Sequence, residues 1–268
     1  MREFDCLTRE ATTVESCLMK KRTLLASIAL AALALIVLMR WEAGNHRIAA
    51  PRETYLKQSS TEYLWENAAP SSDHAKLFAV VDDYLKGLPA GASLVDMGCG
   101  NGAFLSRLRG RGWTLVGVDL STSGIAIAKR QWPDIRFEVA DATGDLGFLG
   151  YGTFDAVIST DVVEHVFLPR LLSANCFRLL KPAGTLVIST PYHGYAKDLG
   201  IALTNQWDHH HDPLWDYGHI KFWSVRTLSE LLFESGFQDL EWRGVGRLPF
   251  LWNEMIIKAR VPSHRGRN

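Results

Sequence analysis

The spacing of hydrophobic and polar positions changes in a regular way along the middle of the chain. Between residues 93 and 191, apolar runs of strand length alternate with segments in which apolar residues recur every three or four positions. Runs of the first kind are typical of strands buried on both faces, and segments of the second kind are typical of amphipathic helices. Their alternation predicts β-α-β units, in which helices cover both faces of a parallel sheet.

The predicted elements define one α/β domain. Strands are expected in the runs 93–98, 114–121, 135–142, 154–160 and 184–191, and helices over 74–88, 103–112, 123–132, 168–184 and 224–237. Two last apolar stretches, 238–245 and 249–259, are expected to complete the sheet as a hairpin-like pair. We therefore predict a Rossmann-like, doubly wound, mostly parallel seven-stranded sheet with an antiparallel edge strand, preceded by an N-terminal apolar helix.

The regular alternation is interrupted by a long segment, residues 192–222, which is rich in aromatic, histidine and aspartate residues. Long irregular segments inside a compact domain are usually lids or binding loops. The run Asp208–Asp212 consists only of acidic and histidine residues, but neighbouring side chains on a strand or helix point in different directions. The segment therefore favours a lid held by Trp207, Trp215 and Tyr217 over a metal site.

An apolar run without charged residues covers residues 23–39, with basic residues on both sides. It stands at the short end of the range of about 17–25 residues that a spanning helix needs. We expect a single-pass transmembrane anchor here, with a signal sequence or a start codon placed too far upstream as alternatives. The expected organisation is an extension, the anchor, a linker with lead-in, the main domain and a tail, over residues 1–22, 23–39, 40–72, 73–260 and 261–268.

The composition is that of an ordinary globular protein, with 47% hydrophobic and 22% charged residues. The 29 basic residues balance 29 acidic residues, so the charge gives no indication of a nucleic-acid partner. The four cysteines lack the spacing of a disulfide framework or a metal site, which is typical of reduced thiols in a cytosolic domain. The G-x-S-x-G, H-E-x-x-H and Walker sequences do not occur, which excludes three common classes of hydrolases and NTPases.

The stretch SLVDMGCGNGAFLSRL, residues 93–108, is typical of a buried strand, a glycine-rich turn and a helix. Residues 98–103 satisfy the G-x-G-x-x-G/A pattern, and Asp119 closes the next strand, where a ribose-binding carboxylate is expected. This pattern alone fits an NAD-dependent oxidoreductase. Asp96, however, precedes the first glycine, and a carboxylate about 4 Å from a pyrophosphate charge costs on the order of 4 kcal/mol at an effective dielectric constant near 20.

S-adenosylmethionine has no phosphate at this position. Its methionine end carries an ammonium group and its sulfur is a sulfonium, so a carboxylate beside the turn is favourable. The glycines let the backbone approach such a ligand without a clash from Cβ atoms. The turn therefore favours S-adenosylmethionine as the cofactor, with an NAD-dependent oxidoreductase of Rossmann type or a non-catalytic S-adenosylmethionine-binding protein as alternatives.

These motifs resemble those of the class I S-adenosylmethionine-dependent methyltransferases, over about residues 77–258. LVDMGCGNG is similar to their first motif, Asp119 in GVDLS to their ribose-binding acid, and VADA with Asp141 to their third motif, whose acid approaches the adenine amino group. FDAVISTDVVEHV is similar to the fourth motif. The resemblance implies a cofactor site made of Asp96, Gly98, Gly100, Gly102, Asp119, Leu120, Asp141, Ala142 and Thr160.

Within the class, STDVVEHV resembles the ubiquinone-biosynthesis O-methyltransferases, in which an acid-x-x-Glu-His set contributes to a divalent-metal site. In this chain the set is Asp161, Glu164 and His165, which would share one face of a helix at spacings of i, i+3 and i+4. Asp161 stands where the metal-binding relatives carry a longer Glu. Two carboxylates and an imidazole suit Mg²⁺, Mn²⁺ or Zn²⁺, and such an ion lowers the pKa of a bound hydroxyl.

Two roles without a metal stay open for the same residues. His165 alone is a candidate general base for the acceptor hydroxyl. Glu164 and His165 are also a candidate pair that orients the helix and loop by hydrogen bonding. The predicted catalytic residues are His165, Glu164 and His193, with His219 as a further candidate base.

The acceptor is expected to be a small molecule with a phenolic or other hydroxyl group. The aromatic insertion and the apolar N-terminal run favour an apolar or quinone-like acceptor and association with a membrane through residues 23–39. Because S-adenosylmethionine is a cytosolic metabolite, we expect the catalytic domain in the cytoplasm, anchored to the inner membrane by a single N-terminal helix.

Overall fold

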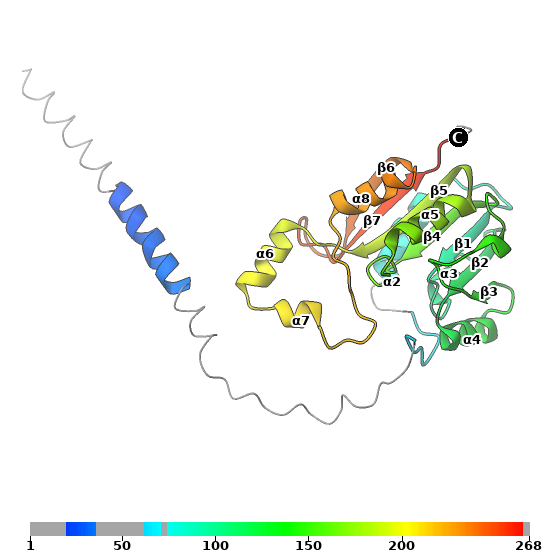
Figure 1. Cartoon of the computed structure of the whole chain (residues 1–268), viewed down its shortest axis with the longest axis horizontal. Coiled ribbons are helices and arrows are strands. Elements are labelled where there is room, and N and C mark those ends of the chain that lie inside the picture. Colours follow the sequence, from blue (N-terminus) through cyan, green and yellow to red (C-terminus); the bar gives the residue numbers. More distant parts are fainter. Residues whose placement is uncertain (1–19, 36–61, 71–73, 265–268) are drawn as a thin grey trace, which may run out of the picture. The chain divides into compact units, whose positions relative to one another are not determined.

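The computed structural model describes residues 20–35, 62–70 and 74–264 (Figure 1). The chain divides into two compact units, Met1–Lys57 and Gln58–Asn268.

In the first unit, residues 20–35 form a helix whose side chains are exposed. In the ranges that the structure describes, no helix combines the length and the apolar character needed to cross a membrane. The predicted transmembrane anchor over residues 23–39 is therefore not supported, and its last residues, 36–39, lie outside the described ranges.

The second unit is built around a seven-stranded sheet of order β3-β2-β1-β4-β5-β7-β6 (Figure 1). Its strands are β1 (Ser93–Met97), β2 (Thr114–Asp119), β3 (Arg136–Val139), β4 (Phe154–Thr160), β5 (Leu180–Pro191), β6 (Gln238–Val245) and β7 (Glu254–Arg260). Neighbours from β3 to β5 are parallel, whereas β7 is antiparallel to both β5 and β6. The predicted α/β class, the mostly parallel sheet and the last antiparallel pair are confirmed.

The antiparallel strand, however, is not at the edge of the sheet, where the sequence predicts it. β7 carries Met255, Ile256 and Ile257, which are fully buried. β6 carries charged and polar residues and is mostly exposed. An inner position covers both apolar faces of β7, and the more polar β6 protects the open edge from pairing with another chain.

The helices of this unit are α2 (His74–Leu85), α3 (Ala103–Ser106), α4 (Thr122–Gln131), α5 (Pro169–Leu179), α6 (Tyr195–Leu203), α7 (Trp207–His211) and α8 (Val225–Glu234), with a 3-10 turn at Gly147–Leu149. Side chains cap two of them: Ser121 accepts a backbone N–H at the start of α4, and Ser224 forms a capping box with Thr227 in α8. The helix predicted over 103–112 is shorter, because after Ser106 the backbone continues as turns with bonds to the third residue back.

Two hydrophobic clusters fill the two faces of the sheet. Val95 and Met97 of β1 belong to one cluster and Leu94 to the other, as the alternation of side chains along a strand requires. Residues of α5 and α8 cover the first cluster, and residues of α2, α3 and α4 cover the second. The parallel strands therefore all end at one edge of a sheet with both faces covered, and ligands of open α/β sheets bind at that edge.

Candidate functional site

The glycine-rich turn joins β1 to α3 at the carboxyl edge of the sheet. Gly98, Gly100 and Gly102 have φ values of 83°, 54° and 78°, a region that residues other than glycine rarely adopt. A Cβ on Gly100 would meet the ring of Trp65, and a Cβ on Gly102 would meet the ring of Phe137. These glycines are therefore required by the backbone conformation and by protein packing, in addition to the predicted close approach of a ligand.

Asp96 lies in β1, two residues before the first glycine of the turn. Its side chain is 1% exposed, and neither carboxylate oxygen has a hydrogen-bond partner among the described residues. Burial, and secondarily the charge of Asp119, raise the pKa of Asp96 to about 8. Because a buried carboxylate without partners is unfavourable, this position favours a ligand with a positive charge or N–H donors and disfavours an anionic one.

Asp119 ends β2 and holds the glycine turn in place. Its Oδ2 accepts a hydrogen bond of 2.7 Å from the backbone N–H of Gly100, and its Oδ1 accepts one of 2.7 Å from the N–H of Ser121. Burial raises the pKa of Asp119, although these two N–H donors oppose the shift. The structure thus brings Asp96, the glycines and Asp119 together; their roles toward the cofactor stay predictions.

The other predicted cofactor residues lie at the same edge of the sheet. Leu120 follows β2 and is 61% exposed, Asp141 and Ala142 follow β3, and Thr160 ends β4. Asp141 is exposed, and its Oδ1 accepts hydrogen bonds of 2.7 Å from the backbone N–H and the hydroxyl of Thr143. An exposed apolar side chain and an exposed carboxylate at one edge suit an adenine ring, which presents an apolar face and an amino group.

Residues 62–70 also lie against the glycine turn, although the sequence pattern predicts only a linker and lead-in there. The side-chain amide of Asn101 donates hydrogen bonds of 2.9 Å to the backbone carbonyls of Asn67 and Ala69. The ring of Trp65 packs beside the turn. The signal that could have indicated this docking is the aromatic Trp65 in otherwise polar surroundings.

The predicted helix face in the fourth motif does not form. Asp161 leaves β4 with a φ of 56°, and residues 161–168, the fourth-motif turn, contain no helix before α5 begins at Pro169. Proline at the first helical position sets the start of α5, because its missing N–H is not needed there. Asp161 instead accepts a hydrogen bond of 2.7 Å from the hydroxyl of Ser189 in β5.

Glu164 is buried between β5 and the insertion, residues 192–222. Its side chain is 1% exposed; Oε2 accepts a hydrogen bond of 2.9 Å from the hydroxyl of Thr190, whereas Oε1 has no partner among the described residues. Burial, and secondarily the charge of a neighbouring carboxylate, raise the pKa of Glu164 well above its usual value. Its backbone carbonyl accepts hydrogen bonds of 2.9 and 3.0 Å from the N–H groups of Ile220 and Lys221, so Glu164 joins the fourth-motif turn to the insertion.

His165 faces Glu164 with a ring nitrogen that can accept a proton. Its Nδ1 is 2.8 Å from the carbonyl oxygen of Tyr217 and 3.2 Å from that of Gly218. Because a carbonyl oxygen only accepts, Nδ1 carries the hydrogen and Nε2 carries the lone pair, at 4.0 Å from Oε1 of Glu164. Burial lowers the pKa of His165, so the ring is predominantly neutral at pH 7. His219 packs edge-on against it, with 4.9 Å between the ring centroids.

His193, the third predicted catalytic residue, lies in a cluster with two other histidines of the insertion, and the charges of this cluster also act on His219. Its ring centroid is 5.8 Å from that of His210 and 5.7 Å from that of His211. Burial is the main cause that lowers the pKa of His193 to about 4. Its backbone N–H donates a hydrogen bond of 3.2 Å to the carbonyl of Trp223, so the two ends of the insertion lie side by side.

The insertion contains α6 and α7, which Figure 1 shows apart from the sheet. The aromatic residues predicted to hold it, Trp207, Trp215 and Tyr217, are 54%, 41% and 47% exposed. The two indole rings pack on histidines instead: Trp207 stacks on His211 at 4.1 Å, and Trp215 lies 5.2 Å from His219. The insertion is joined to the domain by backbone hydrogen bonds to Glu164, by the buried ring of Tyr192 in the core, and by Trp215, whose ring centroid lies 5.8 Å from that of His165.

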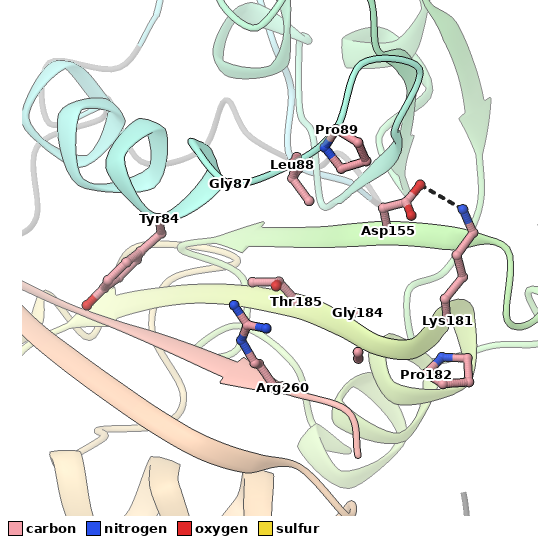
Figure 2. A pocket seen from close by; sticks show the side chains of 11 residues that line it. Tyr84, Gly87, Leu88, Pro89, Asp155, Lys181, Pro182, Gly184, Thr185 and Arg260 are labelled. Carbon is pink, nitrogen blue, oxygen red and sulfur yellow. Dashed lines mark hydrogen bonds and ion pairs between the residues drawn. The ribbon is translucent and has the colours of Figure 1, made fainter. Parts of the chain in front are cut away.

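A pocket of about 270 Å³ lies at the opposite edge of the sheet, where β4 and β5 begin (Figure 2). Residues that line it include Tyr84, Leu88, Asp155, Lys181 and Arg260. Figure 2 shows the ion pair in its wall, in which Nζ of Lys181 is 2.8 Å from Oδ2 of Asp155. Because the ligands of open α/β sheets bind at the carboxyl ends of the strands, this pocket is not the candidate active site.

Comparison with known proteins identifies the family. Residues 66–241 match the family model described as a methyltransferase domain. The chain belongs to this methyltransferase family. Among curated proteins, the chain is similar to the ubiquinone biosynthesis O-methyltransferase of Thiobacillus denitrificans, with 28% identity over 160 residues that cover 58% of this chain and 68% of that protein.

Solved structures share the fold of this methyltransferase at lower identity. Phosphoethanolamine N-methyltransferase 2 of Haemonchus contortus, in complex with S-adenosyl-L-methionine, matches with 18% identity and a TM-score of 0.57, covering 69% of this chain and 52% of that chain. The cyclase SpnF matches with 19% identity and a TM-score of 0.58, covering 75% and 86%. These likenesses show the fold alone. Together with the family match they confirm the predicted class of S-adenosylmethionine-dependent methyltransferases over the NAD-dependent oxidoreductase.

Proposed function

We propose that this methyltransferase transfers a methyl group to the hydroxyl oxygen of a small phenolic acceptor, with His165 as the general base. The observation that carries the proposal is the pair formed by Nε2 of His165 and Oε1 of Glu164. These two atoms face each other at 4.0 Å, and Oε1 has no hydrogen-bond partner in the described ranges. At this separation they do not bond each other. Nε2 carries a lone pair, so an acceptor hydroxyl placed beside it has a partner for its proton.

The choice of S-adenosylmethionine as the cofactor in this proposal rests on Asp96. A buried carboxylate without partners suits the ammonium group of S-adenosylmethionine and repels a pyrophosphate. Leu120 and Asp141 would hold the adenine, and Asp119 the ribose, at the same edge of the sheet. S-adenosylmethionine supplies an electrophilic methyl group when it is bound.

In this arrangement His165 removes the proton of the acceptor hydroxyl, and Glu164 orients that hydroxyl. General-base assistance of this kind contributes about 10²–10⁴-fold to a rate, and positioning of the reacting atoms contributes the larger share. The hydrogen bond from Nδ1 of His165 to Tyr217 keeps the lone pair on Nε2. Because burial lowers the pKa of His165, the base is already deprotonated at neutral pH.

Two observations support a phenolic acceptor with apolar or quinone-like character. The insertion carries the exposed aromatic rings of Trp207, Trp215 and Tyr217, and the ring of Trp215 lies edge-on against His165 of the fourth-motif turn. The similar protein from Thiobacillus denitrificans bears the name ubiquinone biosynthesis O-methyltransferase.

The experiment is a methyl-transfer assay with the full chain and S-adenosylmethionine labelled in its methyl group. Catechol, a catechol with an alkyl tail and o-phenylenediamine serve as acceptors. We expect the label on oxygen, a higher kcat/KM for the tailed catechol, and no transfer to the diamine. His165→Gln should lower kcat/KM by about 10²–10⁴-fold, whereas His209→Gln, at an exposed histidine of the insertion, should leave it unchanged.

Transfer to the diamine nitrogen in place of the catechol oxygen would contradict the proposal. Binding of S-adenosylhomocysteine without transfer to any of the three acceptors would also contradict it, and would favour the non-catalytic alternative.

A further inference from the structure

The pocket where β4 and β5 begin is lined by a cation that no carboxylate neutralises. Nζ of Lys181 pairs with Asp155 at 2.8 Å, whereas the side chain of Arg260 forms no hydrogen bond or ion pair within the described part of the chain. Lys258, two residues earlier on the same face of β7, does have a partner, because its Nζ lies 3.0 Å from Oε1 of Glu241. The charge of Arg260 is therefore available to a ligand.

The sheet places Arg260 beside a hydroxyl group. Arg260 is the direct antiparallel partner of Thr185 in β5, so the two side chains project from the same face of the sheet. Thr185 is buried, and its hydroxyl has no hydrogen-bond partner among the residues that the structure describes. Figure 2 shows the guanidinium group beside this hydroxyl. The planar N–H donors of arginine and one O–H donor therefore meet at the pocket.

The side of the pocket that belongs to α2 and to the turn after it is apolar (Figure 2). It consists of the ring of Tyr84 at the end of α2 and of Leu88 and Pro89 in the turn. Gly87 and Gly184 also line the pocket and contribute no side chain to fill it. A cationic group together with an apolar surface suits an anion that carries an apolar group.

The charges that line the pocket favour a singly charged anion. Arg260 and Lys181 contribute two positive charges and Asp155 one negative charge. A carboxylate would neutralise the remaining positive charge, whereas a phosphate dianion would bring an excess negative charge near Asp155. The two oxygens of a carboxylate also match the N–H donors of arginine in a bidentate pair. The volume of about 270 Å³ lies just below the range of about 300–1,000 Å³ typical of drug-sized ligands, so the ligand is small.

We propose that this pocket binds a small organic acid, whose carboxylate pairs with Arg260 and Thr185 and whose apolar part packs on Tyr84 and Leu88. The site lies at the edge of the sheet opposite the glycine turn, and Arg260 lies beyond residues 66–241, which match the family model. It is therefore independent of the acceptor and of the proposed function. A ligand there contacts α2, β5 and β7 at once and should stabilise the folded chain.

The test is a calorimetric titration of the full chain with sodium benzoate, at constant ionic strength and in a buffer without other carboxylates or phosphate. We expect one benzoate per chain. Arg260→Gln should raise the Kd at least about tenfold, as the loss of a hydrogen bond to a charged group does. Arg260→Lys should raise it less, because lysine keeps the charge but not the planar pair of donors. Benzamide, the neutral analogue, should bind at least about tenfold more weakly than benzoate.

Three further variants locate the bound benzoate. A Cβ on Gly87 meets no atom within 4 Å, so Gly87→Leu can be accommodated and should raise the Kd by filling the pocket. His165→Gln alters the proposed acceptor site at the other edge of the sheet and should leave the Kd unchanged. Arg226→Gln removes an exposed arginine of α8 and is the matched control for the loss of one positive charge. It should also leave the Kd unchanged.

A thermal measurement guards against misfolded variants. Because Arg260 is exposed, Arg260→Gln should melt like the wild type without ligand, and benzoate should raise the melting temperature of the wild type alone. Wild-type affinity of Arg260→Gln or Gly87→Leu for benzoate, or no binding by the wild type, would overturn the proposal. Displacement of benzoate by inorganic phosphate at pH 8 would overturn the assignment to a carboxylate. Weaker binding by His165→Gln would place benzoate in the acceptor site, which would overturn this inference and leave the proposed function intact.

Discussion

Because burial keeps Asp96 protonated, the cofactor-free protein should become less stable as the pH rises. The pKa of Asp96 is about 8 in the folded chain and about 3.9 in an unfolded chain. Between these values the folded state binds more protons than the unfolded state, so the free energy of unfolding decreases with increasing pH. One pH unit corresponds to at most about 1.4 kcal/mol, and the interval from pH 5 to pH 7 therefore to at most about 3 kcal/mol.

Asp96→Asn removes this titration while nearly preserving the shape of the side chain. We expect the free energy of unfolding of the wild type, relative to that of the variant, to fall by up to about 3 kcal/mol between pH 5 and pH 7. Urea unfolding of both full chains at several pH values, without cofactor, measures this difference. The same variant should lose affinity for S-adenosylhomocysteine, because the ammonium group of this ligand no longer meets a carboxylate.

Asp155→Asn is the matched control at the other end of the sheet. Although burial raises the pKa of Asp155, the hydrogen bonds and charge from Lys181 and Ser93 hold it below its usual value. Its stabilising effect is present above the unfolded pKa and is lost as the pH falls through the folded pKa, so this variant should be destabilised by a constant amount from pH 5 to pH 7. A constant offset for Asp96→Asn as well, or a slope of opposite sign, would refute the reasoning.

Two further predictions concern the turn and the buried thiols. Gly100→Ala should lower the free energy of unfolding by about 1–3 kcal/mol, because alanine is strained at a φ of 54°. In a double variant with Gly100→Ala, the further change Trp65→Ala should restore only the stability that was lost to the steric clash with the indole ring. Full recovery of the free energy of unfolding in urea would show that the backbone is not strained. Burial raises the pKa of the Cys99 thiol well above its usual value and that of Cys176 to about 12. Both thiols should resist iodoacetamide at pH 8 in the folded chain and react in urea, as mapped by mass spectrometry; labelling in the folded chain would contradict the burial.

The parallel half of the fold could be predicted because its strands are continuous apolar runs separated by helical spacing. The position of β7 could not, because a hairpin-like pair of apolar stretches can join a sheet with either strand inside. The burial of residues such as Ile256 shows that β7 is the inner strand of the pair. Burial depends in turn on the helices that cover the sheet. The general lesson is that spacing predicts which face of a strand is apolar but not which strand is its neighbour.

The candidate site was predictable only where its residues are close in sequence. Asp96, the glycine turn and Asp119 lie in one β-α-β unit, so their meeting follows from the topology. The helix expected to include Asp161 does not form, although the sequence contains a signal against it. Pro169 marks the first position of a helix that begins only after this segment. His219 lies far along the chain from His165, and no spacing rule connects residues that only the folded insertion brings together.

The insertion leaves and re-enters the domain at one place, since the N–H of His193 bonds to the carbonyl of Trp223. A loop whose ends already meet is insensitive to its own length, and each doubling adds only about 0.6 kcal/mol of closure entropy. Because the two ends of the insertion are fixed at one place, segments of different size and chemistry can be exchanged there during evolution, while the strands that carry the predicted cofactor residues keep their positions. Under the proposal that the insertion contacts the acceptor, acceptor preference can therefore diverge among proteins of this architecture faster than cofactor use.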